Sequence, residues 1–258
     1  MFKRLSIFGI CLVAALCTLP VANAVEPTYV VGSGGTYRPF EFENSKKELE
    51  GFDIDIISAI AKAENFNIKL VNTPWEGIFA TLGSGDRDII ISGITITDKR
   101  KQMVDFSAPY FPAEQAIVIP KNKNIKSIAE LKPLKVGVVN SSTGDIVVSE
   151  VLGKNSTSIK RFDNTPLMLQ ELYEDGIDAA VGDVGVAKFY IKNHPEKEFS
   201  LVADDKFERQ FFGIAVAKGN EELRNKINTG LKKIIADGTY ATIYQKWFDS
   251  NVPVLPAE

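Results

Sequence analysis

The chain has 258 residues, of which 45% are hydrophobic and 24% are charged, so a disordered, collagen-like or low-complexity protein is excluded. With one histidine and two cysteines it lacks the ligands for a histidine-rich metal site or a disulfide scaffold, and we expect neither a metal nor a cofactor. The net charge of −3 disfavours nucleic acid or an anionic membrane surface as a partner.

The first 24 residues have the organisation of a secretory signal peptide. Lys3 and Arg4 precede an apolar run over residues 7–19, and Ala22-Asn23-Ala24 places small residues where a signal peptidase cleaves. The run is shorter than the ~20 apolar residues that span a bilayer. Both cysteines lie inside it. We therefore expect residues 1–24 to be removed, leaving a periplasmic protein without cysteine.

In the first part of the remaining chain, β-rich runs alternate with helical patterns, which is typical of α/β layers. Strands are predicted over residues 29–32, 68–71 and 88–92. Apolar residues recur at helical spacing over residues 53–64 and predict a helix with one buried face. Thr73 and Pro74 have the residue types of an N-cap and a first helical position, so a second helix is predicted from there to Gly83.

The same alternation restarts after Pro120. Strands are predicted over residues 135–139 and 178–181. Helices are predicted over residues 143–153, 165–173, 183–192 and 221–236, with a last apolar helical face from Tyr240 to Trp247. The two α/β units follow each other without a flexible linker, so we expect two lobes joined by strands.

Short motifs in a fixed order closely resemble those of the periplasmic polar amino-acid-binding proteins of ABC importers, solute-binding protein family 3. They are PFEF at residues 39–42, GFDID at 51–55, GITITDKR at 93–100, DFS at 105–107 with PY at 109–110, and IYQKWF at 243–248. As a set they are specific, because they span nearly the whole mature chain. Residues 92–102 and 140–144 are most similar to the arginine- and lysine-binding branch, and next to the glutamine-binding branch.

The resemblance implies an α/β fold of the type II periplasmic binding protein kind, with two lobes, two hinge crossings and a ligand cleft. Lobe 1 would comprise residues 25–109 and 212–258. Lobe 2 would comprise residues 110–211, with hinge strands at both ends. The lobes would close over a ligand bound in the cleft.

A free amino acid carries a carboxylate and an ammonium on one carbon, so a selective cleft needs a cation, an anion and backbone donors at short range. The residues that match the family's ligand-binding positions are Tyr37, Trp75, Ser92, Gly93, Thr95, Arg100, Ser142, Thr143 and Asp183. Arg100 matches the arginine that binds the carboxylate, for which its planar guanidinium offers two parallel hydrogen bonds. Read alone, residues 98–101 favour an exposed charged turn instead.

Further groups would complete the site. The resemblance assigns the Thr95 hydroxyl and amide to the carboxylate, and the Gly93 carbonyl to the ammonium. On the other lobe, Thr143 would present an amide at a helix N-terminus. Asp183 would hold the ammonium, although a plain helix N-cap is the stronger reading without the resemblance. Because Arg100 and Asp183 would lie on different lobes, a bound ligand could tie the lobes together.

The preference for the ligand's side chain depends on one departure from the family. Tyr37 and Trp75 match aromatic positions that flank this side chain, and their faces suit a guanidinium or ammonium group. The family often carries an acid where this chain has Gly34, so a buried cation needs another carboxylate. The unassigned acids near the cleft motifs are Glu41, Glu76 and Asp145. We expect arginine ahead of lysine, with glutamine as the alternative if no carboxylate reaches the pocket.

We therefore predict a periplasmic solute-binding protein that captures a polar L-amino acid and delivers it to an ABC permease in the inner membrane. It would act as a monomer and perform no chemistry. The alternative from another class is an enzyme on the same fold, because cyclohexadienyl dehydratases are similar to these binding proteins. Such an enzyme needs a placed general acid, whereas the unassigned acids are better explained as surface residues.

Overall fold

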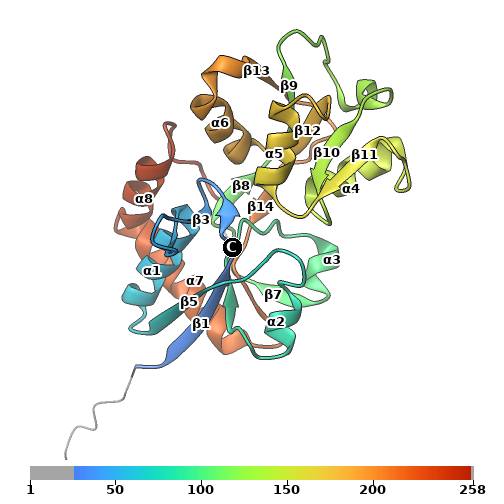
Figure 1. Ribbon diagram of the computed structural model, residues 1–258. Coiled ribbons are helices and arrows are strands. Elements are labelled where there is room, and N and C mark those ends of the chain that lie inside the picture. The colour runs from blue at the N-terminus through green and yellow to red at the C-terminus, as the bar shows by residue number, and fades with distance from the viewer. Residues whose placement is uncertain (1–25, 257–258) are drawn as a thin grey trace, which may run out of the picture.

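The structure, a computed structural model, describes residues 26–256. They form two α/β lobes, one above the other in Figure 1, with extended segments running between them. Residues 1–24, predicted to be a signal peptide, lie outside the described residues. None of the helices within residues 26–256 combines the length and the apolar character needed to span a bilayer.

The lower lobe in Figure 1 is built on a five-stranded sheet of order β5-β1-β6-β15-β7. Its strands are β1 (Thr28–Ser33), β5 (Asn67–Asn72), β6 (Ile89–Ile90), β7 (Val104–Phe106) and β15 (Ala215–Ala217). β5, β1 and β6 run parallel, whereas β15 pairs antiparallel with both of its neighbours. The loops after β1 and β6 therefore leave the same edge of the sheet, which is where α/β folds bind ligands.

Helices with one apolar face pack on this sheet, as their spacing predicts. They are α1 (Phe52–Ala63) and α7 (Glu221–Ala236), and α8 (Thr239–Trp247) packs against these two helices. Ile56 and Ile60 of α1 and Ile227 of α7 are fully buried and belong to one hydrophobic core. The sequence predictions for these helices are confirmed to within a residue or two.

The helix predicted to begin at Thr73 is wrong over most of its length. Only α2 (Ala80–Gly83) is helical, and the residues before it form turns. The Thr73 hydroxyl donates to the Val71 carbonyl at 2.9 Å and accepts from Arg87 Nε at 3.0 Å, so it does not cap a helix. The irregular segment that results carries Trp75 into the space between the lobes.

The upper lobe has a second five-stranded sheet, of order β11-β10-β12-β9-β13. Its strands are β9 (Gln115–Pro120), β10 (Val136–Val139), β11 (Ile159–Phe162), β12 (Ala179–Asp183) and β13 (Phe199–Val202). The helices are α4 (Thr143–Leu152), α5 (Thr165–Tyr173) and α6 (Val184–Asn193), with short 3₁₀ turns at Ile128–Leu131 and Pro195–Lys197. α4 and α6 begin directly after the parallel strands β10 and β12, so their N-termini face the same edge.

Two extended segments, β8 (Phe111–Ala113) and β14 (Gln210–Phe212), pair antiparallel between the lobes. They lie where the hinge crossings are predicted. Phe207, which precedes β14 in the chain, packs against a core cluster of the upper lobe, so it lies outside the hinge. We propose the lobe boundaries stated above, after residues 109 and 211.

A small three-stranded sheet links the hinge to the cleft. It consists of β2 (Thr36–Tyr37), β3 (Glu41–Glu43) and β4 (Leu49–Glu50). Between β2 and β3, the fully buried Phe40 ring contacts Phe111 of β8 and Phe212 of β14, with ring centroids 4.8 and 5.3 Å apart. This aromatic anchor fixes the segment that carries Tyr37 and Glu41 into the cleft.

Candidate ligand-binding cleft

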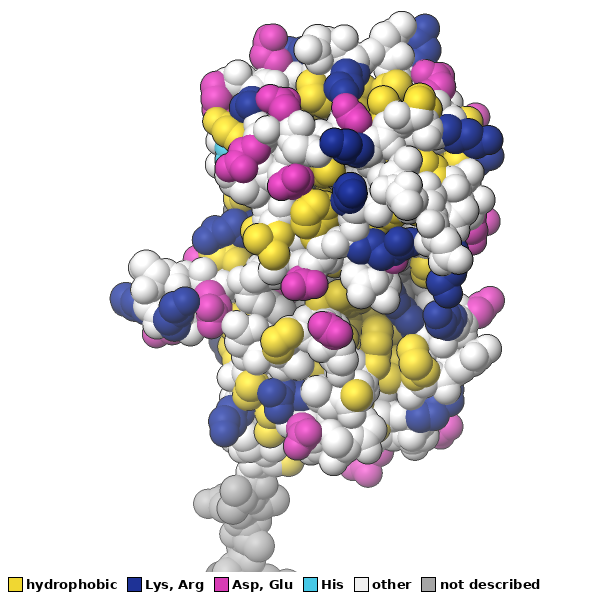
Figure 2. Space-filling view, turned by 45° about the vertical axis from the view of Figure 1, so that its right-hand side comes forward, with side chains coloured by type: hydrophobic (Ala, Val, Ile, Leu, Met, Phe, Trp, Pro, Cys, Tyr) yellow, Lys and Arg dark blue, Asp and Glu magenta, His cyan; other side chains and the backbone are white. Residues whose placement is uncertain are grey.

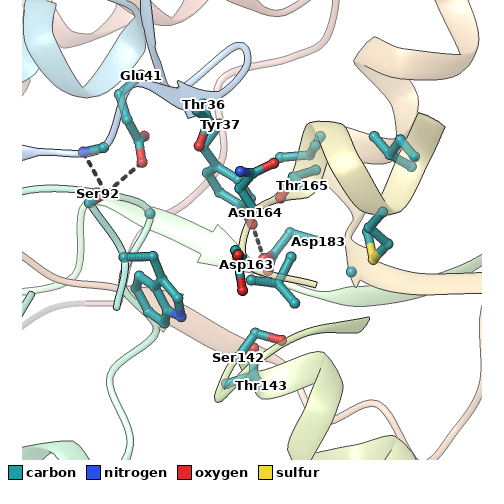
Figure 3. A pocket seen from close by; sticks show the side chains of 18 of the residues that line it. Thr36, Tyr37, Glu41, Ser92, Ser142, Thr143, Asp163, Asn164, Thr165 and Asp183 are labelled. Carbon is teal, nitrogen blue, oxygen red and sulfur yellow. Dashed lines mark hydrogen bonds between the residues drawn. The ribbon is translucent and has the colours of Figure 1, made fainter. Parts of the chain in front are cut away.

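A cavity of about 410 Å³ lies between the two lobes. All the residues predicted to bind ligand line it: Tyr37, Trp75, Ser92, Gly93, Thr95, Arg100, Ser142, Thr143 and Asp183. Figure 3 shows Glu41 and Ser92 on one side of this pocket and Ser142 and Thr143 on another, with Tyr37 and Asp183 between them. The structure thus brings the predicted residues together, and their individual binding roles stay predictions.

Arg100 is a buried cation in the wall of the cavity. It lies in the short helix α3 (Asp98–Lys101), in which the Thr97 hydroxyl accepts from the Arg100 amide at 3.2 Å. The guanidinium donates from Nη1 to the Thr95 carbonyl at 2.9 Å and lies 5.1 Å from the centre of the Trp75 ring. Burial lowers the pKa of Arg100 to about 10, so it stays charged at neutral pH. Arg100 is only 6% exposed, so the interpretation as an exposed charged turn is wrong for this residue, although Asp98, Lys99 and Lys101 are exposed.

Asp183 lines the same cavity as Arg100 but belongs to the upper lobe, where it ends β12. It occupies the N-cap position of α6, but its side chain makes no capping bond. The carboxylate instead accepts hydrogen bonds from the Tyr37 hydroxyl and, at 2.7 Å, from Gln115 Nε2. Burial raises the pKa of Asp183 to about 6, against these two bonds and the charge of Arg100, which lower it. The capping interpretation of its side chain is therefore wrong, and the carboxylate is available to a cation.

The loop before α4 offers backbone donors opposite Arg100. The Ser142 hydroxyl caps α4 by accepting from the Asp145 amide at 3.1 Å, and Thr143 begins the helix. Ser141 has a positive φ of 60°, and its amide donates to Asp145 Oδ2 at 3.1 Å. Arg161 Nε donates to the same carboxylate at 2.9 Å. Asp145 is thus paired with Arg161 and shapes the loop, and it is not among the residues that line the cavity.

Direct contacts cross the cleft. The Tyr37 hydroxyl of the lower lobe donates to Asp183 of the upper lobe. Trp75 Nε1 donates to the Asn140 carbonyl at 3.0 Å, while Arg100 Nη2 reaches the Ser141 carbonyl at 3.5 Å. The two walls of the cavity are therefore close enough for one small molecule to contact both.

The space beside Gly34 is occupied by Glu41. The Gly34 amide donates to the Ser92 hydroxyl at 3.0 Å, and this hydroxyl donates to Glu41 Oε1 at 2.7 Å. A Cβ atom at Gly34 would lie 3.5 Å from Glu41 Oε1. Of the unassigned acids, Glu41 is buried in the cavity wall, and Glu76 lines the cavity but is exposed. Glu41 thus places a buried carboxylate beside residue 34.

Several lining residues are missing from the sequence predictions. Gln115, Asp163 and Asn164 all line the cavity. Gln115 is 5% exposed, and a polar residue at the start of the apolar run of β9 was a signal that could have identified it. Asn164 caps α5 by accepting from the Leu167 amide at 3.0 Å, so its position follows from helix capping rather than from a binding motif.

Two lobes, and a cleft between them that is lined by the buried cation Arg100 and by the acid Asp183, define a two-lobed solute-binding protein. Residues 29–250 match the model of the bacterial extracellular solute-binding proteins, family 3. The chain belongs to this family, and the resemblance read from its motifs is confirmed. Among residues 26–256 no cluster of histidine, cysteine and acidic side chains suited to a metal ion is present.

Relatives and solved structures agree with this assignment. A "Probable histidine-binding protein" of Neisseria gonorrhoeae is 44% identical over 89% of this chain and 85% of its own length. The histidine-binding periplasmic protein of Salmonella typhimurium is 30% identical over 97% and 98%. The arginine-, lysine-, histidine-binding protein of Geobacillus stearothermophilus has a TM-score of 0.83 and 38% identity, covering 87% of this chain and 96% of that one. An ancestral arginine-binding protein bound to arginine has a TM-score of 0.82 and 43% identity over 86% and 99%.

Proposed function

We propose that the protein is the periplasmic solute-binding component of an ABC importer and that it binds a cationic L-amino acid, arginine or lysine. The observation that carries this proposal is the placement of Arg100, Asp183 and Glu41 around one cavity between the lobes. It acts as a monomer that presents the ligand to a permease in the inner membrane, after removal of residues 1–24. Basic and acidic side chains are interspersed on the face in Figure 2, which supports the view that it does not bind nucleic acid.

The α-carbon groups of the ligand bind to both lobes. Its carboxylate accepts from Arg100 and from the amides of Thr95 and Thr143, where the N-terminus of α4 also favours an anion. Its ammonium donates to Asp183 and to the Gly93 carbonyl. A zwitterion held by Arg100 and Asp183 stabilises the closed arrangement of the lobes, because it contacts both walls only when they are close.

The ligand's side chain extends between Tyr37 and Trp75 toward Glu41. Contact with an aromatic face contributes about 0.5 to 2 kcal/mol to the binding of a flat guanidinium. A buried cation also needs an opposite charge. Glu41 is 1% exposed, and its Oε2 has no hydrogen-bond donor among residues 26–256. It is the counter-charge that favours arginine and lysine over glutamine.

Histidine is the second candidate ligand. It is favoured by the names of the relatives from Neisseria gonorrhoeae and Salmonella typhimurium. Its imidazolium is shorter than the side chain of arginine and carries a full charge only below about pH 6.5. Arginine therefore fits a deep acidic pocket better at neutral pH.

The enzyme alternative rests on one structural neighbour. An ancestral amino acid-binding protein described as a precursor of cyclohexadienyl dehydratase has 38% identity and a TM-score of 0.79. Glu41 would be the general acid of such an enzyme. We favour binding without turnover because relatives that match this chain over most of its length carry the names of binding proteins. Incubation with prephenate or arogenate separates the classes, since product formation would reject the transport role.

A thermal-shift panel of the twenty amino acids tests the proposed ligand. A ligand present at a hundred times its Kd stabilises the folded protein by about 2.7 kcal/mol, which is a measurable rise in Tm. We expect the largest rise with L-arginine, then lysine, and no rise with D-arginine as the control. A larger rise with glutamine would assign the protein to the glutamine-binding branch, and a larger rise with histidine would make that the ligand.

A further inference from the structure

A pair of buried carboxyl groups lies behind the Ser92–Gly93 loop of the cavity. Glu41 extends from β3 and is 1% exposed, and Asp53 extends from the first turn of α1 and is 0% exposed. Each holds one residue of the loop, because Ser92 donates to Glu41 and the Gly93 amide donates to Asp53 Oδ2 at 2.7 Å. Any change in the charge of this pair acts directly on the cavity wall.

The two carboxyl groups hold adjacent residues of the loop, and the charge of each acts on the other. Asp53 Oδ2 also accepts from the Tyr110 hydroxyl at 2.9 Å. The remaining oxygens, Glu41 Oε2 and Asp53 Oδ1, have no hydrogen-bond partner among residues 26–256. An ionised carboxylate only accepts hydrogen bonds, so two neighbouring buried carboxyl groups can bond to each other only when one of them carries a proton.

The groups that face the pair do not supply a cation. Asp183 and Tyr37 face it from across the cavity, and Tyr110 faces it from the start of the hinge segment. Burial, and next the charge of Asp53, raise the pKa of Glu41 well above its ordinary value. Burial raises the pKa of Asp53 to about 7, although bonds from Gly93 and Tyr110 lower it. Buried acids without a counter-cation hold their protons.

We propose that Glu41 and Asp53 share a proton in the empty protein, and that a cationic ligand side chain displaces it to solvent whereas a neutral side chain leaves it in place. This inference rests on the proposed function, because it requires the ligand's side chain to reach Glu41. It makes Asp53 a positioning residue that sets the charge of Glu41 and does not itself contact the ligand.

A proton shared by Glu41 and Asp53 determines how the affinity for a cationic ligand changes with pH. A cation beside Glu41 favours the ionised pair, so the bound protein releases its proton at a lower pH than the empty protein does. Binding therefore releases a proton in the range between these two values, and affinity for the cation rises with pH there. At one proton released per ligand, the rise is about tenfold per pH unit. A neutral ligand shows no such rise from this pair.

The test compares L-arginine with L-citrulline, its neutral counterpart of nearly the same shape. Calorimetric titrations at pH 6.5 in phosphate and in Bis-Tris give the number of protons released, because both buffer at this pH and take up protons with different heats. Asp183 also titrates near this pH, but both ligands present it with the same ammonium, so the difference between the ligands isolates the carboxyl pair. We expect arginine to release about half a proton or more in excess of citrulline.

Two variants of β3 make the assignment specific. Glu41→Gln keeps a donor for Asp53 but removes the shared proton, and we expect the excess proton release to vanish and the preference for arginine over citrulline to fall at least tenfold. Glu43→Gln is the same change on the same strand, outside the cavity. In this variant the excess proton release and the preference for arginine over citrulline should equal those of the wild type. Arginine binding with no excess proton release would overturn this inference and leave the proposed function standing. Failure of every cationic amino acid to bind would overturn both.

Discussion

Replacing Arg100 by alanine is expected to abolish amino-acid binding while leaving the fold intact. Hydrogen bonds to charged groups are worth about 1.5 to 3 kcal/mol each, so the loss of two from the ligand carboxylate weakens binding roughly a hundredfold or more. The fold survives because α3 is capped through the Arg100 amide and the Thr97 hydroxyl, which the substitution keeps. Calorimetry gives the affinity, and circular dichroism gives the Tm.

Arg100→Lys and Lys99→Ala complete this experiment. Lysine keeps the charge but not the planar pair of donors, so it should restore only part of the affinity. Lys99 is the exposed neighbour in the same helix, and its alanine variant should bind as the wild type does. Binding of Arg100→Ala within tenfold of the wild type would reject the assignment of the carboxylate to Arg100.

Asp183→Asn should weaken binding by a similar factor, because the ligand ammonium loses its charged partner in a buried site. Asparagine still accepts from Tyr37 and can donate to Gln115 Oε1, which lacks a donor among residues 26–256, so the cleft wall keeps its shape. Asp163→Asn is the matched control, since Asp163 lines the same cavity but is exposed. Calorimetry with arginine compares the three proteins.

The same variant tests the closing of the lobes. A ligand that contacts Arg100 and Asp183 binds the closed state more tightly and shifts the population toward it. Small-angle scattering of the wild type should therefore show a smaller radius of gyration with saturating arginine, and Asp183→Asn should show a weaker response at the same concentration. The wild type must be purified free of ligand and shown to bind arginine. If its radius of gyration is then the same with and without arginine, closure of the lobes is contradicted.

Local sequence patterns predict the longer helices and five of the strands within residues 26–256, because the cause of these elements is local, whereas β9, β11 and β13 are not predicted. The apolar spacing of α1 and the cap of α5 follow from residues within one or two turns. The helix predicted at Thr73 fails for the opposite reason, since its hydroxyl is engaged by Arg87, fourteen residues away in sequence. The double crossing between lobes came from the family resemblance, which local periodicity cannot replace, and the order of strands in each sheet is seen only in the structure.

The candidate site, too, could be predicted from the sequence only in part. Motif positions identified the residues that the structure gathers around the cavity, but not which of the unassigned acids lies beside Gly34. The proximity of Glu41 to Gly34 and Ser92 depends on how the β2–β3 hairpin folds back, with Tyr37 opposite Glu41 in its register. Asp53 reads in sequence as an ordinary acid in the first turn of a helix, and only the structure reveals its contact with Gly93.

A crystal structure of the protein with bound L-arginine would locate the three charged groups of the ligand in one experiment. We expect the carboxylate on Arg100, the ammonium on Asp183, and the guanidinium within hydrogen-bond distance of Glu41, between Tyr37 and Trp75. Arginine bound in the reverse direction, or with its guanidinium directed to Asp163 and away from Glu41, would contradict this assignment.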